Sequence, residues 1–247
     1  MVCGMKLTDG VYLVGSGRNG VFLTHELDCN CYLLDFGDCL ALFDCGIGIH
    51  PQLITEEANR DGFSMRDIAY LFLTHCHGDH SGGAAYFREM FGMQVAVPKA
   101  EAKALAKGDE KALGLDVARK AGFYPADYVL NKCRADEMLT PGPWCRDGID
   151  MELFAAMGHS TGGICYYGTI GGRRFFIGGD LVMAGGKISL QLIPGADVHA
   201  YAECIKAVEN LDVDLFLPGH GLVQLRDGGH PLKMAGEAFE HLYIPVG

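Results

Sequence analysis

The stretch from Thr74 to His80 constrains this chain more than any other. It has the sequence Thr-His-Cys-His-Gly-Asp-His, so three imidazoles and one carboxylate occupy six consecutive positions. The apolar run Ala69–Leu73 precedes it and predicts a buried strand. The segment Ala84–Phe91 follows it, and its apolar periodicity predicts a helix. The polar cluster is therefore expected on a strand-to-helix turn, where side chains can converge and backbone N–H groups face outward.

This cluster predicts a metal site. Imidazole nitrogens and carboxylate oxygens are the donors that zinc and similar divalent ions take. One such histidine has ordinary alternatives as a hydrogen-bonded surface or core residue. Four titratable side chains beside a buried strand are different, because leaving them buried and unpaired costs several kcal/mol.

Composition and charge set the class of protein. The chain has 247 residues, of which 49% are hydrophobic and 21% charged, so we expect a globular protein with one domain over residues 1–247. The formal net charge is −11, and no run of lysine and arginine appears. Nucleic acid and anionic membranes are therefore excluded as expected partners. A small-molecule substrate is expected instead.

Cysteine usage and apolar runs indicate the compartment. No apolar run approaches the roughly 18–20 residues of a membrane span, and the first residues do not have the pattern of a signal peptide. The cysteines are scattered without a C-x-x-C pair, so we expect reduced thiols and a cytoplasmic protein. They are Cys3, Cys29, Cys31, Cys39, Cys45, Cys76, Cys133, Cys145, Cys165 and Cys204.

Elsewhere, short β-prone runs alternate with helical segments. The first four runs are expected to form an antiparallel meander before the buried strand, and two β-rich-then-helical halves predict two sheets with helices outside. The segment 98–121 is expected to form one or two helices broken near Gly108 and Gly114. The other strands are expected at 11–14, 20–23, 31–36, 40–43, 94–97, 149–156, 164–169, 174–177 and 214–217, and the other helices at 51–60, 196–210 and 231–243.

Three further polar residues, His159, Asp180 and His220, each lie beside glycines at the end of a predicted strand. Glycines there let the backbone turn tightly and approach a ligand closely. With the first cluster they make five histidines and two aspartates, too many for one tetrahedral zinc but suited to two metals that share a carboxylate. Ordinary surface or core roles are expected for the remaining histidines, which are His25, His50, His199, His230 and His241.

Several residues keep two interpretations. Asp44, in the turn Asp-Cys-Gly after a predicted strand, is either a simple turn carboxylate or a group that orients a ligand. The segment 123–128 either covers the site as a lid or packs structurally. The residues between Leu181 and Asp197 are expected to flank the cleft, where Lys187 is either a solvated charge or a partner for a substrate carboxylate.

The ordered motifs T-H-C-H-G-D-H, G-H-S-T-G, G-G-D and L-P-G-H-G resemble those of the metallo-β-lactamase superfamily, in its glyoxalase II-like and lactonase-like branch. The likeness runs from about Val11 to His220 and includes the early Asp-x-Gly at Asp44. It implies an α/β fold, a four-layer αβ/βα sandwich of two mixed β-sheets flanked by helices. It also implies a first metal on His75, His77 and His159, a second on Asp79, His80 and His220, and Asp180 as the bridge.

The resemblance implies a dinuclear zinc hydrolase that cleaves a small acyl substrate (an ester, lactone, thioester or amide) with a metal-bridging hydroxide as the nucleophile. Two Zn²⁺ are expected, with iron or manganese as options, and Asp79 also has the catalytic role of moving a proton. Glutathione thioesters are disfavoured because the tail after His220 has only Arg226 and Lys233 as cations. Lactones are disfavoured because the homoserine-lactone hydrolases that this chain resembles usually have a tyrosine shortly after the bridging aspartate, and none shortly follows Asp180.

One alternative on the same fold is an oxidoreductase. Persulfide dioxygenases resemble this chain and bind a single Fe(II) with two histidines and one aspartate, which here would be His75, His159 and Asp180. A tRNA-processing role is disfavoured by the negative charge. The residues do not determine the oligomeric state, and a homodimer is one option.

Overall fold

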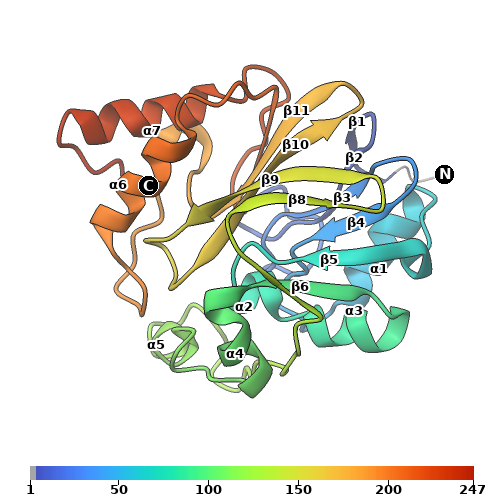
Figure 1. The fold of residues 1–247 in the computed structure, drawn as a ribbon. Helices are drawn as coiled ribbons and strands as arrows, with labels where there is room; N and C mark the ends of the chain where they lie inside the picture. Colours follow the sequence, from blue (N-terminus) through green and yellow to red (C-terminus); the bar gives the residue numbers. More distant parts are fainter. Residues whose placement is uncertain (1–3) are drawn as a thin grey trace.

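Two mixed β-sheets face each other across an apolar core, and helices cover the outer face of each sheet (Figure 1). This arrangement is seen in a computed structural model that describes residues 4–247. The layers follow the predicted order of helix, sheet, sheet and helix. Cys3 lies outside the described residues.

The first sheet contains seven strands within residues 4–247, in the order of the sequence. The first four pair antiparallel in a meander that contains the predicted strands near 11–14, 31–36 and 40–43, and the fourth to the seventh pair parallel. The strands are β1 (Lys6–Thr8), β2 (Val11–Gly15), β3 (Cys31–Asp35), β4 (Leu40–Phe43), β5 (Ile68–Phe72), β6 (Gln94–Pro98) and β7 (Glu137–Leu139).

The second sheet has the order β12-β11-β10-β9-β8. Its first four strands in sequence pair antiparallel, and β12 pairs parallel with β11. The strands are β8 (Gly142–Arg146), β9 (Ile149–Ala156), β10 (Gly163–Ile170), β11 (Arg173–Gly179) and β12 (Leu215–Pro218).

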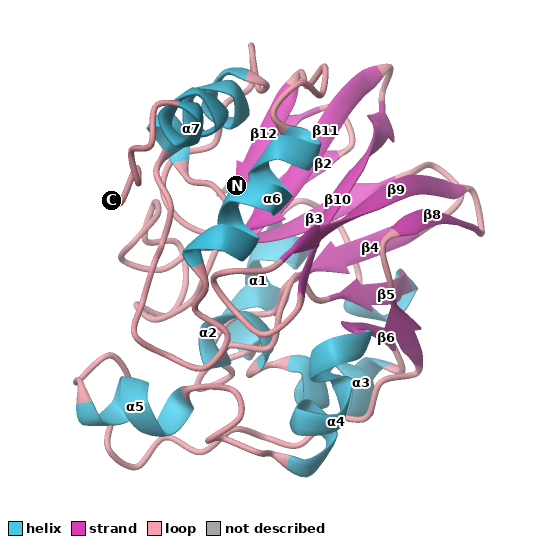
Figure 2. Ribbon diagram, turned by 60° about the vertical axis from the view of Figure 1, so that its left-hand side comes forward, coloured by secondary structure: helices cyan, strands magenta, loops and turns pink. Residues whose placement is uncertain are grey.

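Helices bury the outer faces of both sheets. α1 (Gln52–Arg60), α3 (Ala84–Phe91) and α4 (Lys99–Lys107) pack against the first sheet. α6 (Val198–Val208) and α7 (His230–Glu240) pack against the second sheet, as Figure 2 shows from another side. The remaining short helices are α2 (Gly78–Ser81), α5 (Leu115–Lys120) and two 3₁₀ turns at Met65–Asp67 and Ala184–Gly186.

The core between the sheets is built largely from aromatic rings. The ring centroid of Phe72 on β5 lies 5.1 Å from that of Phe43 on β4 and 5.6 Å from that of Tyr166 on β10. Because side chains alternate along a strand, the neighbouring Leu71 faces the helices while Phe72 faces the opposite sheet. Both faces of β5 are therefore buried, which explains why its sequence is continuously apolar.

The helices predicted from the sequence are all present, with ends shifted by a few residues. The predicted strand at 20–23 is wrong. That segment forms a loop, in which Ser16 Oγ accepts a hydrogen bond from the N–H of Val21, and Phe22 has a positive φ of 57°. Strands β1, β7 and β8 were not predicted, because their runs are short and contain exposed residues.

Strand direction brings the ends of separate strands together. β4 and β5 run parallel, so both end at one edge of the first sheet. β9, β11 and β12 share one direction in the second sheet, since β10 is antiparallel to both β9 and β11. Loops at such edges can hold functional side chains on a rigid scaffold.

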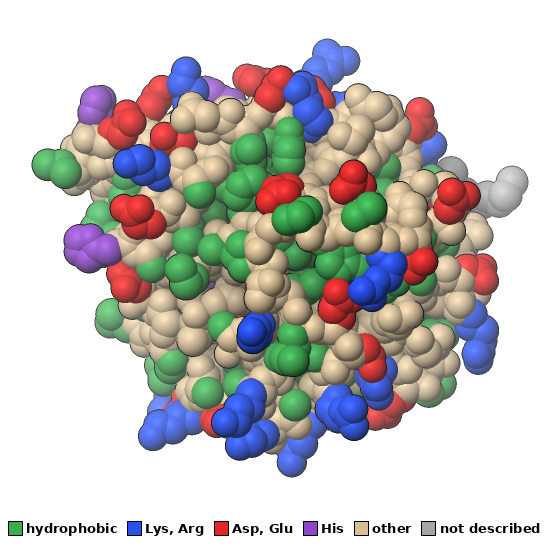
Figure 3. Space-filling model, in the orientation of Figure 1, with side chains coloured by type: hydrophobic (Ala, Val, Ile, Leu, Met, Phe, Trp, Pro, Cys, Tyr) green, Lys and Arg blue, Asp and Glu red, His purple; other side chains and the backbone are tan. Residues whose placement is uncertain are grey.

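The surface carries charges of both signs. On the face drawn in Figure 3, lysines and arginines are most frequent along the lower margin, and acidic and basic side chains are mixed along the upper one. None of the helices formed by residues 4–247 is long and apolar enough to cross a membrane.

We expect Phe72→Ala to lower the free energy of unfolding by about 3–5 kcal/mol, because it opens a cavity between the two sheets. Met138→Ala is the control, since Met138 on β7 is 61% exposed and its truncation is expected to cost about 0.5 kcal/mol or less. Urea denaturation of both variants, each at the same metal loading, measures the difference. A Phe72→Ala cost equal to that of Met138→Ala would contradict the assigned core.

Candidate metal centre

All seven residues expected as metal ligands lie in loops or short turns that follow strands. His75 and His77 follow β5, and α2 carries Asp79 and His80 directly afterwards. The other three follow strands of the second sheet, namely His159 after β9, Asp180 after β11 and His220 after β12. The two sheets therefore contribute to one site from opposite sides.

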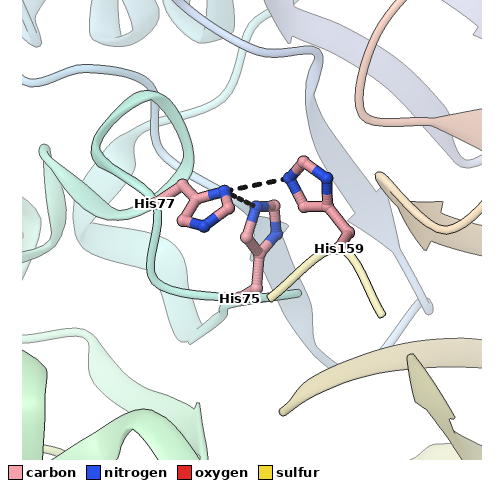
Figure 4. A group of neighbouring side chains, drawn as sticks. All are labelled: His75, His77 and His159. Atoms are coloured by element: carbon pink, nitrogen blue, oxygen red, sulfur yellow. Dashed lines mark hydrogen bonds between the residues drawn. The ribbon is translucent and has the colours of Figure 1, made fainter. Parts of the chain in front are cut away.

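The first group of ligands consists of His75, His77 and His159, whose nitrogens converge on one point (Figure 4). His77 Nδ1 lies 3.0 Å from His75 Nε2 and 2.9 Å from His159 Nε2. One imidazole nitrogen can share one proton with one partner, so these three atoms do not satisfy each other by hydrogen bonds alone. A cation that accepts all three lone pairs fits this arrangement.

Hydrogen bonds on the far side of the rings set which nitrogen faces the centre. His159 Nδ1 lies 2.7 Å from the carbonyl oxygen of Ser189, to which it can only donate, so its Nε2 carries the lone pair. His75 Nδ1 lies 3.1 Å from the hydroxyl of Thr74. Such partners of a ligating histidine fix both its tautomer and its orientation.

The second group of ligands consists of Asp79, His80 and His220. His220 Nε2 lies 3.1 Å from Asp79 Oδ2 and 3.4 Å from His80 Nε2. The mixed oxygen and nitrogen donor set suits zinc and also iron or manganese.

Asp180 lies between the two groups. Its Oδ2 is 3.3 Å from His159 Nε2 and 3.5 Å from His220 Nε2, so one carboxylate reaches ligands of both groups. Its Oδ1 is buried and lies 3.3 Å from His80 Nε2, but it makes no hydrogen bond within residues 4–247. A buried carboxylate oxygen without a donor is costly, and a bound cation would supply the missing partner.

The chain passes very close to this carboxylate. A Cβ added at Gly219 would lie 2.5 Å from Asp180 Oδ1 and 2.7 Å from His80 Cε1. Glycine is therefore required at position 219. This agrees with the expectation that glycines beside the ligands let the backbone approach them closely.

Burial and neighbouring charge favour the metal-binding protonation states of His75, His77, Asp79 and Asp180, whereas neighbouring acidic groups, Asp180 and Asp79 among them, raise the pKa of His80 and of His220 against burial. Burial, reinforced by the neighbouring histidines, lowers the pKa of His75 well below its usual value and that of His77 to about 3. Burial alone would raise the pKa of Asp79, but His80 and His220 outweigh it and lower that pKa. The pKa of Asp180 is likewise lowered against burial, by His220, His80 and His159. Neutral imidazoles and ionised carboxylates are the forms that bind metals.

Asp44 lies behind the second group and orients it. Its Oδ2 is 2.8 Å from His80 Nδ1 and accepts a hydrogen bond from Thr74 Oγ1, while its Oδ1 accepts one from the N–H of Thr74 at 2.7 Å. His80 Nε2 is thereby left to face the metal centre. Asp44 has a φ of 56°, an uncommon conformation for a non-glycine residue. Of its two interpretations, the structure favours orientation of a ligand.

Glu101 on α4 supports the first group, and it was not predicted from the sequence. Its side chain is buried, and its Oε2 accepts a hydrogen bond from the N–H of Cys76 at 2.6 Å. Its Oε1 accepts one from the N–H of Gly162 at 3.1 Å. One carboxylate thus joins the loop of His75 and His77 to the loop of His159.

Five of the seven candidate ligands line a cavity of about 390 Å³, namely His77, Asp79, His159, Asp180 and His220. Phe123 and Tyr124 from the segment 123–128 line it, and the Tyr124 hydroxyl donates a hydrogen bond to Asp79 Oδ1 at 2.7 Å. Of the residues expected to flank the cleft, Met183 lines the cavity, whereas Lys187 Nζ instead donates to the carbonyl oxygen of Val246. The five other histidines lie outside the cavity and the ligand groups of the described chain, on exposed or half-buried positions.

Comparison with known proteins agrees with this geometry. The family model of the metallo-beta-lactamase superfamily matches residues 25–220. A probable metallo-hydrolase from Methanocaldococcus jannaschii is 26% identical over 196 residues, which cover 78% of this chain and 87% of the relative. An acyl-coenzyme A thioesterase from Gallus gallus is 32% identical over 196 residues, which cover 72% of this chain and 67% of the relative.

Solved structures show the same fold. A metallo-beta-lactamase from Cronobacter sakazakii aligns with a TM-score of 0.74 at 21% identity, covering 98% of this chain and 97% of that one. A subclass B3 metallo-beta-lactamase from Bradyrhizobium japonicum aligns with a TM-score of 0.71 at 18% identity, covering 96% and 91%. With the family match over most of its length and hydrolases among its relatives, the chain belongs to the metallo-beta-lactamase superfamily and is a metal-dependent hydrolase.

Proposed function

We propose that this hydrolase is a dinuclear zinc enzyme that cleaves a small acyl substrate, and that acyl thioesters are the substrate class to test first. The observation that carries the two-metal proposal is the position of Asp180 between two complete groups of ligands. A single tetrahedral zinc would use about four of the seven donors and leave buried polar groups unpaired.

Each ligand has a place in this proposal. His75, His77 and His159 would hold one zinc, Asp79, His80 and His220 would hold the other, and Asp180 would be shared. When bound, the two ions supply Lewis acidity toward a carbonyl oxygen and lower the pKa of bound water to about 7. Asp44 and Glu101 would hold the side chains that bind these ions in position. Other residues of the chain shape the cavity above the site.

Asp79 is the residue we place in proton transfer. Its Oδ1 is occupied by the hydroxyl of Tyr124, and its Oδ2 faces the second group of ligands. A carboxylate oxygen has a second lone pair, so Oδ1 could take up a proton beside the Tyr124 hydroxyl and pass it to a leaving group, while Oδ2 stays with the second group of ligands.

The walls of the cavity support an apolar acyl group. Leu27, Ala118, Phe123 and Met183 line it above the ligands. Among the described lining residues, Arg18 is the one lysine or arginine. Its guanidinium nitrogen lies 3.8 Å from a carboxylate oxygen of Glu26, and both side chains are exposed. The thioester is placed first because the relative with 32% identity is an acyl-coenzyme A thioesterase. Esters, lactones and amides share the same tetrahedral chemistry and belong in the same assay.

The dioxygenase alternative is not favoured. A mononuclear Fe(II) on His75, His159 and Asp180 would leave the second group of ligands without a role, although it is complete. Two of the relatives, each matched over 196 residues, carry the names of hydrolases.

We expect protein purified without added metal to contain about two zinc ions per chain by mass spectrometry. Asp180→Asn is expected to lower zinc content and to reduce kcat/KM by more than about 100-fold, because it removes charge from the shared ligand. Asp212→Asn is the control, since Asp212 lies on the surface in an ion pair with Arg174. Full zinc content and an unchanged rate in Asp180→Asn would rule out the shared role, and about one iron per chain would instead favour the dioxygenase.

Glu101→Gln is expected to weaken zinc binding at the first group by about 10- to 100-fold, with the second group unaffected. Glutamine has the same shape, but its NH₂ group would face one of the two backbone N–H donors and leave it unpaired. The matched control is Glu57→Gln, since Glu57 is also buried but pairs with Arg60 on α1, away from the site. Isothermal titration of metal-free protein measures both affinities. Equal effects of the two substitutions would contradict the role of Glu101.

The substrate class is tested with zinc-loaded protein and a panel of an acyl-coenzyme A thioester, an acyl-homoserine lactone, an aryl ester and a chromogenic cephalosporin. We expect the thioester to have the highest kcat/KM, by about 10-fold or more, which corresponds to about 1.4 kcal/mol of transition-state binding. A chelator should abolish the activity, and zinc should restore it. Preference for another member would refute the thioester assignment, and no turnover of any member would refute acyl hydrolysis.

A further inference from the structure

The two oxygens of Asp79 face different parts of the molecule. Oδ2 lies 3.1 Å from His220 Nε2 and belongs to the second group of ligands. Oδ1 accepts the hydrogen bond from the Tyr124 hydroxyl at 2.7 Å. Tyr124 comes from the segment that follows α5, 45 residues along the chain from Asp79. A metal ligand is therefore in direct contact with a segment outside the sheet scaffold.

This segment is held in place by few contacts beyond its two tyrosines. The Tyr128 hydroxyl donates to the carbonyl oxygen of Ile47 at 3.0 Å, and the Arg119 guanidinium binds Glu110 and the carbonyl oxygen of Tyr128. The ring centroids of Tyr124 and Tyr128 are 5.3 Å apart, so the two rings pack together. The six residues from 121 to 127 other than Tyr124 are all exposed, including Phe123 at 57%.

We propose that Tyr124 is a positioning residue that couples metal binding at Asp79, His80 and His220 to the closed conformation of residues 115–128. The Tyr124 hydrogen bond holds Oδ1 away from the centre, so that Asp79 offers Oδ2 to the second metal. A metal on Oδ2 in turn fixes the carboxylate to which Tyr124 binds, and so holds the segment over the cavity. This inference rests on the proposed two-metal centre.

Two physical arguments support the coupling. The hydrogen bond joins a neutral donor to a carboxylate, which makes it shorter and stronger than a bond between neutral groups. Without it, the Asp79 side chain gains rotamers in which Oδ2 leaves the position beside His220. The affinity of the site for the second metal then falls in proportion to the population that is lost from the binding rotamer. Thermodynamic linkage makes this coupling reciprocal. The free energy by which the closed segment strengthens metal binding equals the free energy by which the bound metal favours the closed segment.

The coupling also connects the metals to the substrate cavity. Phe123 and Tyr124 are adjacent and both line the cavity above the ligands. When Tyr124 is bound to Asp79, Phe123 is held as part of the cavity wall. The second metal thus completes a binding surface as well as a reaction centre.

Zinc titration of metal-free Tyr124→Phe against the wild type tests the proposal. The phenylalanine keeps the ring and removes the hydroxyl, so we expect the second zinc to bind about 10- to 100-fold more weakly and the first zinc to bind as in the wild type. Tyr128→Phe is the matched control, because it removes a hydroxyl from the same segment that contacts backbone carbonyls rather than a ligand. It is expected to lower the melting temperature while leaving affinity for the second zinc within about 3-fold of the wild type.

Hydrogen exchange of the peptides covering 109–128 gives a second readout that needs no substrate. In the wild type, the second zinc should increase protection of these peptides, and in Tyr124→Phe this increase should be lost. Unchanged affinity for the second zinc in Tyr124→Phe, or an unchanged increase in protection, would overturn the coupling alone. A wild type that takes up a single zinc would overturn both the coupling and the two-metal centre.

Discussion

The convergence of lone pairs at one edge of the sheets is the constraint on which the rest of this structure depends. Three imidazole nitrogens 2.9–3.0 Å apart cannot all satisfy each other by hydrogen bonds, and a buried oxygen of Asp180 makes no hydrogen bond within residues 4–247. Parallel strand directions bring these groups together, and burial keeps His75 and His77 neutral. The folded chain therefore holds lone pairs and carboxylates close together without a positive partner, and bound cations would supply that partner.

Much of this centre could be predicted from the sequence because its information is local. The cluster from His75 to His80 lies within one turn after a strand, and each remaining ligand has a glycine beside it at a strand end. The structure places all seven side chains in neighbouring groups that could hold a metal. Asp44 was harder to assign, since a turn carboxylate and one that orients His80 have the same local sequence. The contact with His80 spans 36 residues and depends on the parallel pairing of β4 and β5.

The features that were missed depend on distant partners or on weak local signals. Glu101 contacts Gly162 across 61 residues, and Tyr124 contacts Asp79 across 45, so neither role has a mark in the nearby sequence. The segment 20–23 has β-prone residues, but hydrogen bonds to Ser16 hold it as a loop. Strands β7 and β8 were missed because they are short and have exposed positions, and pairing with β6 and β9 determines their conformation.

The region from α4 to Tyr128 supports both groups of candidate ligands, although none of the seven belongs to it. Glu101 on α4 holds the loops of the first group, and Tyr124 beyond α5 holds Asp79 of the second. The same region supplies Ala118 and Phe123 to the cavity wall. Since the ligands come from strand ends and the wall comes from this helical region, a change of substrate can arise there while the metal-binding residues stay the same. A large change there, however, would also disturb the candidate metal-binding residues, because the residues that hold them in position and those that line the cavity belong to the same region, from α4 to Tyr128.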